Sequence, residues 1–193
     1  MGNECCDYEN SGIAVSSDCA NYQGANWFSI ESEPIRGRPQ VITEDAVISD
    51  EVTINAPVEL VWDILLDFDA YGEWNSFCPT ALNTSLELGA AVDMMVNLGD
   101  SLSNQVEYIS RVEPLKCIAW AMANKPEDPV HAQRSQNLKS LDAKSCTYQT
   151  IDEFSGPGKT EMMTHFAPMV EAGFNRCAYD LKARAEQLYS STD

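Results

Sequence analysis

The chain has 193 residues, 44% of them hydrophobic, and a formal net charge of −18 at pH 7, which is typical of one acidic globular domain. Thirty acidic residues against twelve basic ones argue against nucleic-acid binding, because contacts with phosphates need clusters of Lys and Arg. The same balance disfavours docking on anionic lipid. The sequence contains neither a membrane-length apolar run of about eighteen residues nor a secretion signal, so we expect a cytoplasmic protein.

The residue types that most often bind metals are few or irregularly spaced. Seven cysteines occur without any C-x-x-C pair, and we interpret them as reduced thiols. The two histidines, His131 and His165, do not have the spacing of zinc ligands. A phosphate-binding glycine loop and a Ser/His/Asp order are also missing, so we predict neither a metal nor a cofactor.

Residues 1–40 differ in composition from the rest of the chain. They are rich in Asn, Ser, Gly and Glu and lack periodicity, which predicts a flexible or loosely docked N-terminal extension preceding a domain at 41–193. Within it, residues 26–30 are apolar enough to pack on the domain or cover a pocket mouth. Gly2, Cys5 and Cys6 resemble a dual acylation site, but position six is not Ser or Thr and no basic residue is near, so membrane attachment is disfavoured.

From residue 41 onward the pattern becomes regular. A β-rich stretch at 47–54 ends before Pro57, which suits the first turn of a helix. Apolar residues then recur at helical spacing as far as Leu66, and a turn-rich stretch at 67–74 follows. Six more strands are predicted, at about 80–87, 90–98, 103–113, 115–123, 131–141 and 144–155. Short strands with tight turns between them indicate an antiparallel meander.

After residue 158 the period changes to that of one long helix. Pro168 lies inside the run and predicts a kink or a helix start there. The apolar stripe consists of Met162, Phe166, Met169, Val170, Gly173, Phe174, Cys177, Leu181, Ala185 and Leu188.

This order of elements predicts an α+β fold. One helix can cover the apolar face of a seven-stranded antiparallel sheet only if the sheet curls around it, with the two short helices following the first strand. A single helix cannot fill a broad concave face, so we expect a ligand cavity between helix and sheet.

The segment at 52–81 resembles the opening of the SRPBCC superfamily, the helix-grip proteins that include START domains and polyketide cyclases. The residues that carry the likeness are Ala56-Pro57, Val61-Trp62-Asp63, Asp67-Phe68 and Tyr71-x-x-Trp74-Asn75. Later pieces follow in the family's order: Leu88-Gly89, Glu113-Pro114-Leu115 with Trp120, and Glu153-Phe154-x-Gly156. The resemblance covers about 45–190 and implies the helix-grip fold. Because the family is functionally mixed, the fold alone says little about chemistry.

Alternation along the strands selects the side chains that face the cavity. In 103–113 we expect Val106, Tyr108, Ser110 and Val112 to point inward, although a one-residue bulge would reverse any such assignment. The full set of predicted ligand-binding residues is Trp74, Asn75, Phe77, Met94, Val96, Tyr108, Trp120, Met122, Gln136, Thr150, His165, Met169 and Phe174.

Three residues are predicted to be catalytic. An inward Arg134 would stabilise a substrate carbonyl or enolate, and an inward Tyr148 would donate a proton. The non-catalytic alternative is that Arg134 faces solvent and Tyr148 is an ordinary half-buried tyrosine of the sheet. His131 begins its strand in the opposite frame, where it would be a base at the rim or an exposed loop-edge residue.

These residues leave three functional hypotheses open. The first is a cofactor-free polyketide cyclase or dehydratase-like enzyme of secondary metabolism, a lyase or isomerase. The second is a non-enzymatic carrier or sensor of a lipid or other apolar ligand. The third is a protein-interaction module, since the acidic surface would steer basic partners. The high charge is compatible with a monomer or small homo-oligomer.

Overall fold

A computed structural model of the chain describes residues 42–83, 85–99 and 101–191. The expectations for residues 1–40, including the apolar stretch at 26–30 and the possible acylation at Gly2, Cys5 and Cys6, lie outside these residues. The elements in chain order are β1 (Ala46–Ile48), β2 (Val52–Ile54), α1 (Val58–Leu66), the 3-10 helix η1 (Phe68–Glu73), β3 (Thr80–Asn83), β4 (Ala91–Asn97), β5 (Leu102–Glu113), β6 (Cys117–Ala121), β7 (His131–Asp142), β8 (Ser145–Ser155) and α2 (Lys159–Ser190).

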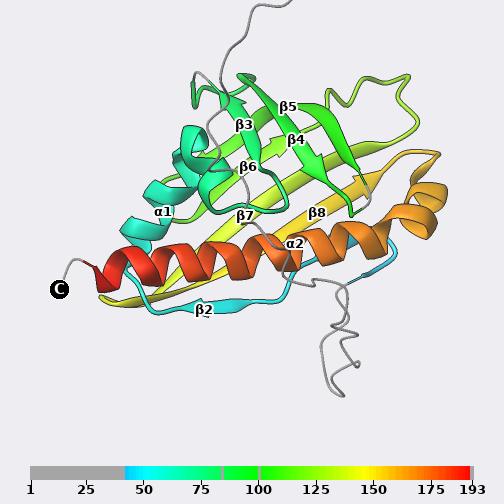
Figure 1. The fold of residues 1–193 in the computed structure, drawn as a ribbon. Helices are drawn as coiled ribbons and strands as arrows, with labels where there is room; N and C mark the ends of the chain where they lie inside the picture. The colour runs from blue at the N-terminus through cyan, green and yellow to red at the C-terminus, as the bar shows by residue number, and fades with distance from the viewer. Residues whose placement is uncertain (1–41, 84, 100, 192–193) are drawn as a thin grey trace, which may run out of the picture. The chain divides into compact units, whose positions relative to one another are not determined.

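The strands form one curled antiparallel sheet in the order β1-β8-β7-β6-β5-β4-β3, with β2 also paired to β8. The sheet curves around α2, and α1 lies beside the C-terminal half of that helix (Figure 1). This arrangement confirms the predicted helix-grip fold.

The sheet has eight strands rather than the predicted seven, because the first strand is interrupted. Ile48 pairs with Ile151, whereas Val52 pairs with Tyr148, so the register along β8 advances by one residue between β1 and β2. The buried Ser49 fills the break: its Oγ accepts a hydrogen bond from the Thr150 N–H at 3.0 Å. The interruption is therefore a bulge in an edge strand, which hydrophobic alternation does not reveal.

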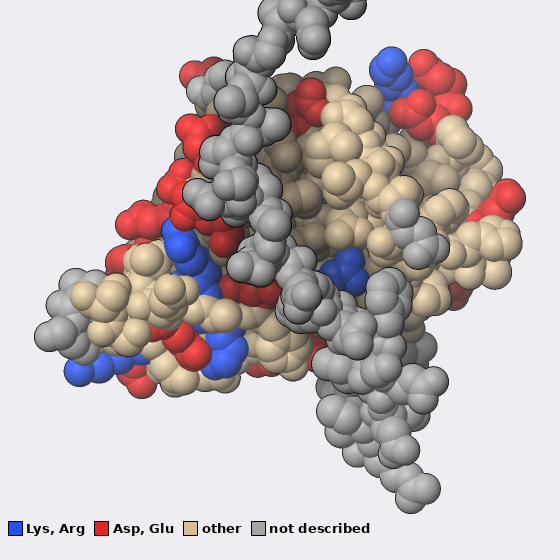
Figure 2. Space-filling model, viewed as in Figure 1, with Lys and Arg blue, Asp and Glu red and all other residues tan. Residues whose placement is uncertain are grey.

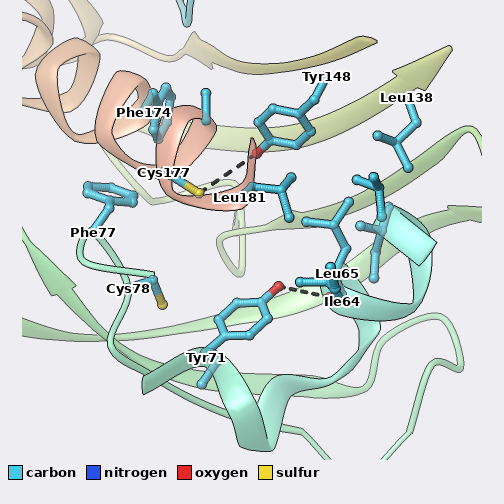
Figure 3. Close-up of a cluster of buried hydrophobic side chains, with 14 of the residues drawn as sticks. Ile64, Leu65, Tyr71, Phe77, Cys78, Leu138, Tyr148, Phe174, Cys177 and Leu181 are labelled. Atoms are coloured by element: carbon cyan, nitrogen blue, oxygen red, sulfur yellow. Dashed lines mark hydrogen bonds between the residues drawn. The ribbon is translucent and has the colours of Figure 1, made fainter. Parts of the chain in front are cut away.

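The two short helices follow the predicted pattern. Pro57 precedes the first turn of α1, where its missing N–H has no cost, and Glu59 lies near the positive end of the helix dipole. In η1 the Tyr71 hydroxyl donates to the Leu65 carbonyl at 2.9 Å, which ties η1 back to α1 (Figure 3).

The long helix α2 begins earlier than Pro168, at Lys159, and continues through the proline. Its first turns bend away from the long axis (Figure 1), as expected where a proline lacks the N–H that would bond to the preceding turn. The predicted apolar stripe holds from Val170 onward. Phe166 and Met169 depart from it, because they are 45% and 38% exposed.

One hydrophobic core joins the sheet to the helices, and Figure 3 shows part of it around Tyr71, Tyr148 and Phe174. The surface is acidic, and Figure 2 shows carboxylates gathered over the region of α1. No helix within the described residues is both long and apolar enough to cross a membrane.

Candidate functional site

A cavity of about 160 Å³ lies between the concave face of the sheet and α2. Seven of the predicted ligand-binding or catalytic residues line it: Phe77, Met94, Val96, Trp120, Met122, Arg134 and Phe174. The other wall residues are Leu98, Gln105, Glu107, Ala132, Asp152, Phe154, Met162 and Val170. The wall is thus mostly apolar, with one guanidinium and two carboxyl groups set into it.

The predicted inward face of β5 was wrong over most of the strand. Tyr108 is 38% exposed on the outer face, while its neighbour Glu107 lines the cavity. The cause is a bulge between Ile109 and Arg111 that shifts the alternation by one residue. Val112, which follows the bulge, does face inward. Counting back from Val112 in steps of two therefore assigns the wrong face to every residue before the bulge.

Four of the predicted cavity residues do not line the cavity, and two of these four support its wall from behind. The Thr150 hydroxyl accepts from Arg134 Nε and donates to the Ser135 carbonyl, both at 3.0 Å. Asn75 accepts the Cys78 N–H at 2.8 Å and so fixes the loop that carries Phe77. The remaining two are buried elsewhere: Gln136 in the core and Trp74 against a separate hollow between α1 and α2.

Tyr148 is fully buried and does not line the cavity. Its hydroxyl donates to Gln136 Oε1 at 2.9 Å and lies 3.8 Å from the Cys177 sulfur (Figure 3). Burial raises the pKa of Tyr148 well above its ordinary value, so the side chain stays a neutral phenol. It is placed to hold β8 against α2 rather than to reach a ligand.

Three further predicted residues lie away from the cavity. His165 and Met169 are exposed on α2. His131 lines a separate open hollow of about 570 Å³ near the start of α2, where its Nε2 is 2.8 Å from the Lys125 carbonyl. That hollow is polar, and Lys159 is paired with Asp45 there. Neither histidine is therefore positioned to act on a molecule in the cavity.

Arg134 is the centre of the site, and aromatic rings and polar contacts hold it in place. Its guanidinium carbon lies 4.5, 5.2 and 5.8 Å from the ring centres of Phe174, Phe77 and Trp120. Nη2 lies 3.6 Å from the Cys177 sulfur. Burial opposes the charge, but neighbouring acidic groups, among them Cys177 and Asp152, raise the pKa of Arg134 above its ordinary value. The buried guanidinium therefore remains charged, stabilised by aromatic faces.

Asp152 lies directly opposite Arg134 across the β7–β8 ladder. Burial, and then the nearby Glu107, raise the pKa of Asp152 to about 8, against a smaller lowering by Arg134. Its Oδ1 is buried without a hydrogen-bond partner in the described part of the chain, and so is Trp120 Nε1. Two polar atoms on cavity-lining residues are thus left unsatisfied, which is uncommon in folded proteins.

Glu107 provides the second carboxyl group of the wall. Burial raises its pKa to about 7, and Arg134 opposes the rise. Sequence reasoning missed both acids for different reasons. Asp152 shares the inward frame of Tyr148 and Thr150 and was available to be chosen, whereas Glu107 was hidden by the β5 bulge.

Near neutral pH the three charged groups hold complementary protonation states. The pKa values of Glu107 and Asp152 are both raised into the neutral range, so the pair can hold one proton between them, while Arg134 keeps its positive charge. A carboxylate, a carboxylic acid and a guanidinium facing one apolar cavity can accept a proton, donate a proton and stabilise an oxyanion. Within the described residues, no group of three or more His, Cys, Asp or Glu side chains is placed to hold a metal ion.

The raised pKa of Asp152 predicts a pH-dependent stability. The folded state binds its proton more tightly than the unfolded state, so the contribution of Asp152 is fullest below the ordinary carboxyl range and is lost as pH rises through about 8. The substitution Asp152→Asn should therefore change the free energy of unfolding more favourably at pH 9 than at pH 5. The two changes should differ by more than about 1.4 kcal/mol.

Urea denaturation at the two pH values measures this difference. Glu153→Gln is the matched control, because Glu153 is the adjacent residue on β8 and is exposed. Equal pH dependence of the two variants would show that Asp152 is ionised in the folded protein like any surface acid.

The fold and the site define a helix-grip protein with an internal, partly charged cavity. The family model described as polyketide cyclase / dehydrase and lipid transport matches residues 45–186, and the chain belongs to this family. Among curated proteins, none matches the chain significantly.

Several solved structures share the fold. The Zhui aromatase/cyclase from Streptomyces sp. R1128 is 19% identical with a TM-score of 0.59, over 74% of this chain and 93% of its own. A START superfamily protein from Mycobacterium smegmatis is 16% identical with a TM-score of 0.57, over 75% of this chain and 99% of its own. The di-domain ARO/CYC StfQ from the steffimycin biosynthetic pathway is 12% identical with a TM-score of 0.57, over 76% of this chain and 53% of its own. At these identities the likeness concerns the fold alone.

Proposed function

We propose that the chain is a cofactor-free enzyme of the cyclase or dehydratase type that acts on a small apolar carbonyl compound. The observation that carries the proposal is the position of Arg134 with the carboxyl groups of Glu107 and Asp152 on the wall of an otherwise apolar cavity. Titratable groups with shifted pKa values in a cleft are typical of active sites, because catalysis needs acids and bases that exchange protons near neutral pH.

The proposed reaction is the dehydration of a β-hydroxy ketone. Arg134 stabilises the negative charge that grows on the carbonyl oxygen. The Glu107 carboxylate removes the proton from the carbon between the carbonyl and the hydroxyl-bearing carbon. The Asp152 carboxylic acid gives its proton to the departing hydroxyl group, so that the products are an enone and water. Transfer of the proton from Glu107 to Asp152, directly or through water, restores the starting state.

The size of the cavity limits what it can enclose. Pockets that bury a drug-sized ligand have volumes of roughly 300–1,000 Å³. The cavity of about 160 Å³ therefore holds a one- or two-ring compound, or the reacting end of a longer one. Met122 lies on the wall and is 37% exposed, so the cavity reaches the surface near this side chain. A longer ligand would extend outward there.

A carrier of an apolar ligand is the second candidate function. The apolar majority of the wall favours it, because carriage requires only burial of the ligand and no proton transfer. The two functions differ in what happens after binding, since a carrier returns its ligand unchanged.

Incubation with the β-hydroxy ketone formed from naphthaldehyde and acetone tests the proposal. The enone product absorbs at longer wavelength than the substrate, so the reaction can be followed directly. We expect a rate above that of buffer and a bell-shaped pH profile, rising near pH 7 as one of the two carboxyl groups ionises and falling near pH 8 as the second ionises. Binding of the substrate without turnover would support the carrier instead, and absence of both would overturn each candidate.

A further inference from the structure

The charges on the cavity wall do not favour the binding of an anion. Among the described residues that line the cavity, Arg134 is the one positive side chain, and Glu107 and Asp152 are both acidic. Glu107, whose pKa is about 7, compensates the guanidinium once it is ionised. A bound carboxylate would add a second negative charge to an apolar enclosure, where an uncompensated charge is costly.

Part of the guanidinium is already used by the protein itself. A strong Arg–carboxylate pair uses two parallel N–H groups along one edge of the guanidinium. On Arg134 the edge made by Nε and Nη2 is occupied, since Nε donates to Thr150 and Nη2 faces the Cys177 sulfur. Three aromatic rings pack around the group. Fewer of its N–H groups therefore remain for a ligand, and these can donate to a neutral oxygen.

The unsatisfied atoms of the wall point to the same class of ligand. Asp152 Oδ1 is buried and lacks a hydrogen-bond partner among the described residues. A carboxylate ligand can only accept from the protonated form of Asp152, and it repels the ionised form. An alcohol or enol donates to the ionised form, and a ketone accepts from the protonated form.

From these three observations we infer that the cavity selects uncharged ligands with a ketone, enol or hydroxyl oxygen, and rejects carboxylates, including fatty acids in their ionised form. The inference rests on the proposed function in one respect, namely that the cavity binds an apolar small molecule. It goes further by stating the charge of that molecule and by assigning the selectivity to Glu107 and Asp152.

The selectivity should depend on pH in a defined direction. The titratable groups that face Arg134 are Glu107 from β5, Asp152 and Tyr148 from β8, Cys177 from α2, Cys78 from the loop before β3 and Tyr71 from η1. The pKa values of both thiols and both phenols are raised, so these four groups stay neutral. Lowering the pH from 9 to 5.5 protonates the two carboxyl groups and leaves the guanidinium uncompensated, so a carboxylate ligand should then bind more tightly.

Methyl naphthyl ketone and naphthoate make a matched pair of probes, because a methyl group in one replaces a charged oxygen in the other. Quenching of tryptophan fluorescence, to which Trp120 on the wall contributes, gives both dissociation constants. At pH 7.5 we expect the ketone to bind at least about tenfold more tightly, a difference of about 1.4 kcal/mol. The variant E107Q/D152N should lose most of that preference by gaining affinity for naphthoate.

Glu153→Gln is again the control, since it removes an exposed acid next to the site and should keep the preference. If the double variant does not fold, D152N alone should narrow the preference in the same direction. Equal or tighter binding of naphthoate by the unmodified protein at pH 7.5 would overturn the inference while leaving ligand binding intact. Binding of neither probe at any pH would overturn the proposed function itself, and the inference with it.

Discussion

Arg134→Gln should lower the turnover of the β-hydroxy ketone by about 10²–10³-fold, which is the usual effect of removing one preorganised oxyanion donor. Gln keeps a hydrogen-bond donor near Thr150 but carries no charge to stabilise the developing enolate. Because Arg134 lowers the pKa of both Glu107 and Asp152, its removal should also move both limbs of the pH profile to higher pH. The rate assay proposed above, repeated across pH, measures both effects.

Two further variants separate catalysis from structure. Arg134→Lys should recover part of the rate, since it restores the charge without the planar group that stacks between three rings. Lys139→Gln is the control, because Lys139 is an exposed cation on the same strand. Arg134 would be shown to be structural by two results together: R134Q loses activity only in proportion to its loss of folded protein, and its pH profile is unchanged.

The sequence was sufficient to predict the fold because each element has a local signal. The proline before α1, the glycine and proline turns between strands and the change of period after residue 158 each act within a few residues. The order of these elements along the chain indicates the helix-grip arrangement without any information on tertiary contacts. The strand count differed only where a one-residue register shift interrupts the first strand at Ser49.

The site was only partly predictable, and the reason is geometric. Which face a strand residue occupies depends on an unbroken count of residues, and the bulge after Ile109 breaks that count in β5. Glu107 was therefore placed outside and Tyr108 inside, the reverse of what the structure shows. In β7 and β8 the residues opposite one another from Ala132 to Ser140 keep a continuous register, and there Arg134 was placed correctly.

Placing a residue on the correct face of the sheet was also not enough to predict that it reaches the cavity. Arg134, Gln136, Tyr148 and Thr150 share the concave face, yet only Arg134 reaches the cavity. The others lie farther along the strands, where α2 packs closely: Tyr148 and Cys177 lie on facing elements with 3.8 Å between oxygen and sulfur. The boundary between cavity and core depends on where the helix approaches the sheet, and a single strand's pattern contains no information on that distance.

Gly173 of α2 lies where the helix approaches the Phe77 ring most closely among the described glycines. A methyl group added there would lie 2.3 Å from two carbons of the Phe77 ring, too close for the ring to remain in place. Phe77 packs edge-on against Phe174 at 5.4 Å and lies beside Arg134, so its displacement disturbs the cavity wall as well as the core. Gly173→Ala should therefore lower the free energy of unfolding by about 1–3 kcal/mol, despite the better helix propensity of Ala.

The contact between Gly173 and Phe77 predicts that the effects of substitutions at these two positions are coupled. Phe77→Ala alone should cost about 3–5 kcal/mol by leaving a void. In the double variant the methyl group introduced by Gly173→Ala meets that void instead of a ring, so its cost should largely disappear and the two effects should be less than additive by about 1 kcal/mol or more. Ala172→Gly, at an exposed neighbouring position, measures the propensity contribution separately. Strict additivity in urea denaturation would mean that the helix, rather than the ring, moves to accept the methyl group, and that the spacing of α2 from the sheet is not set by Gly173.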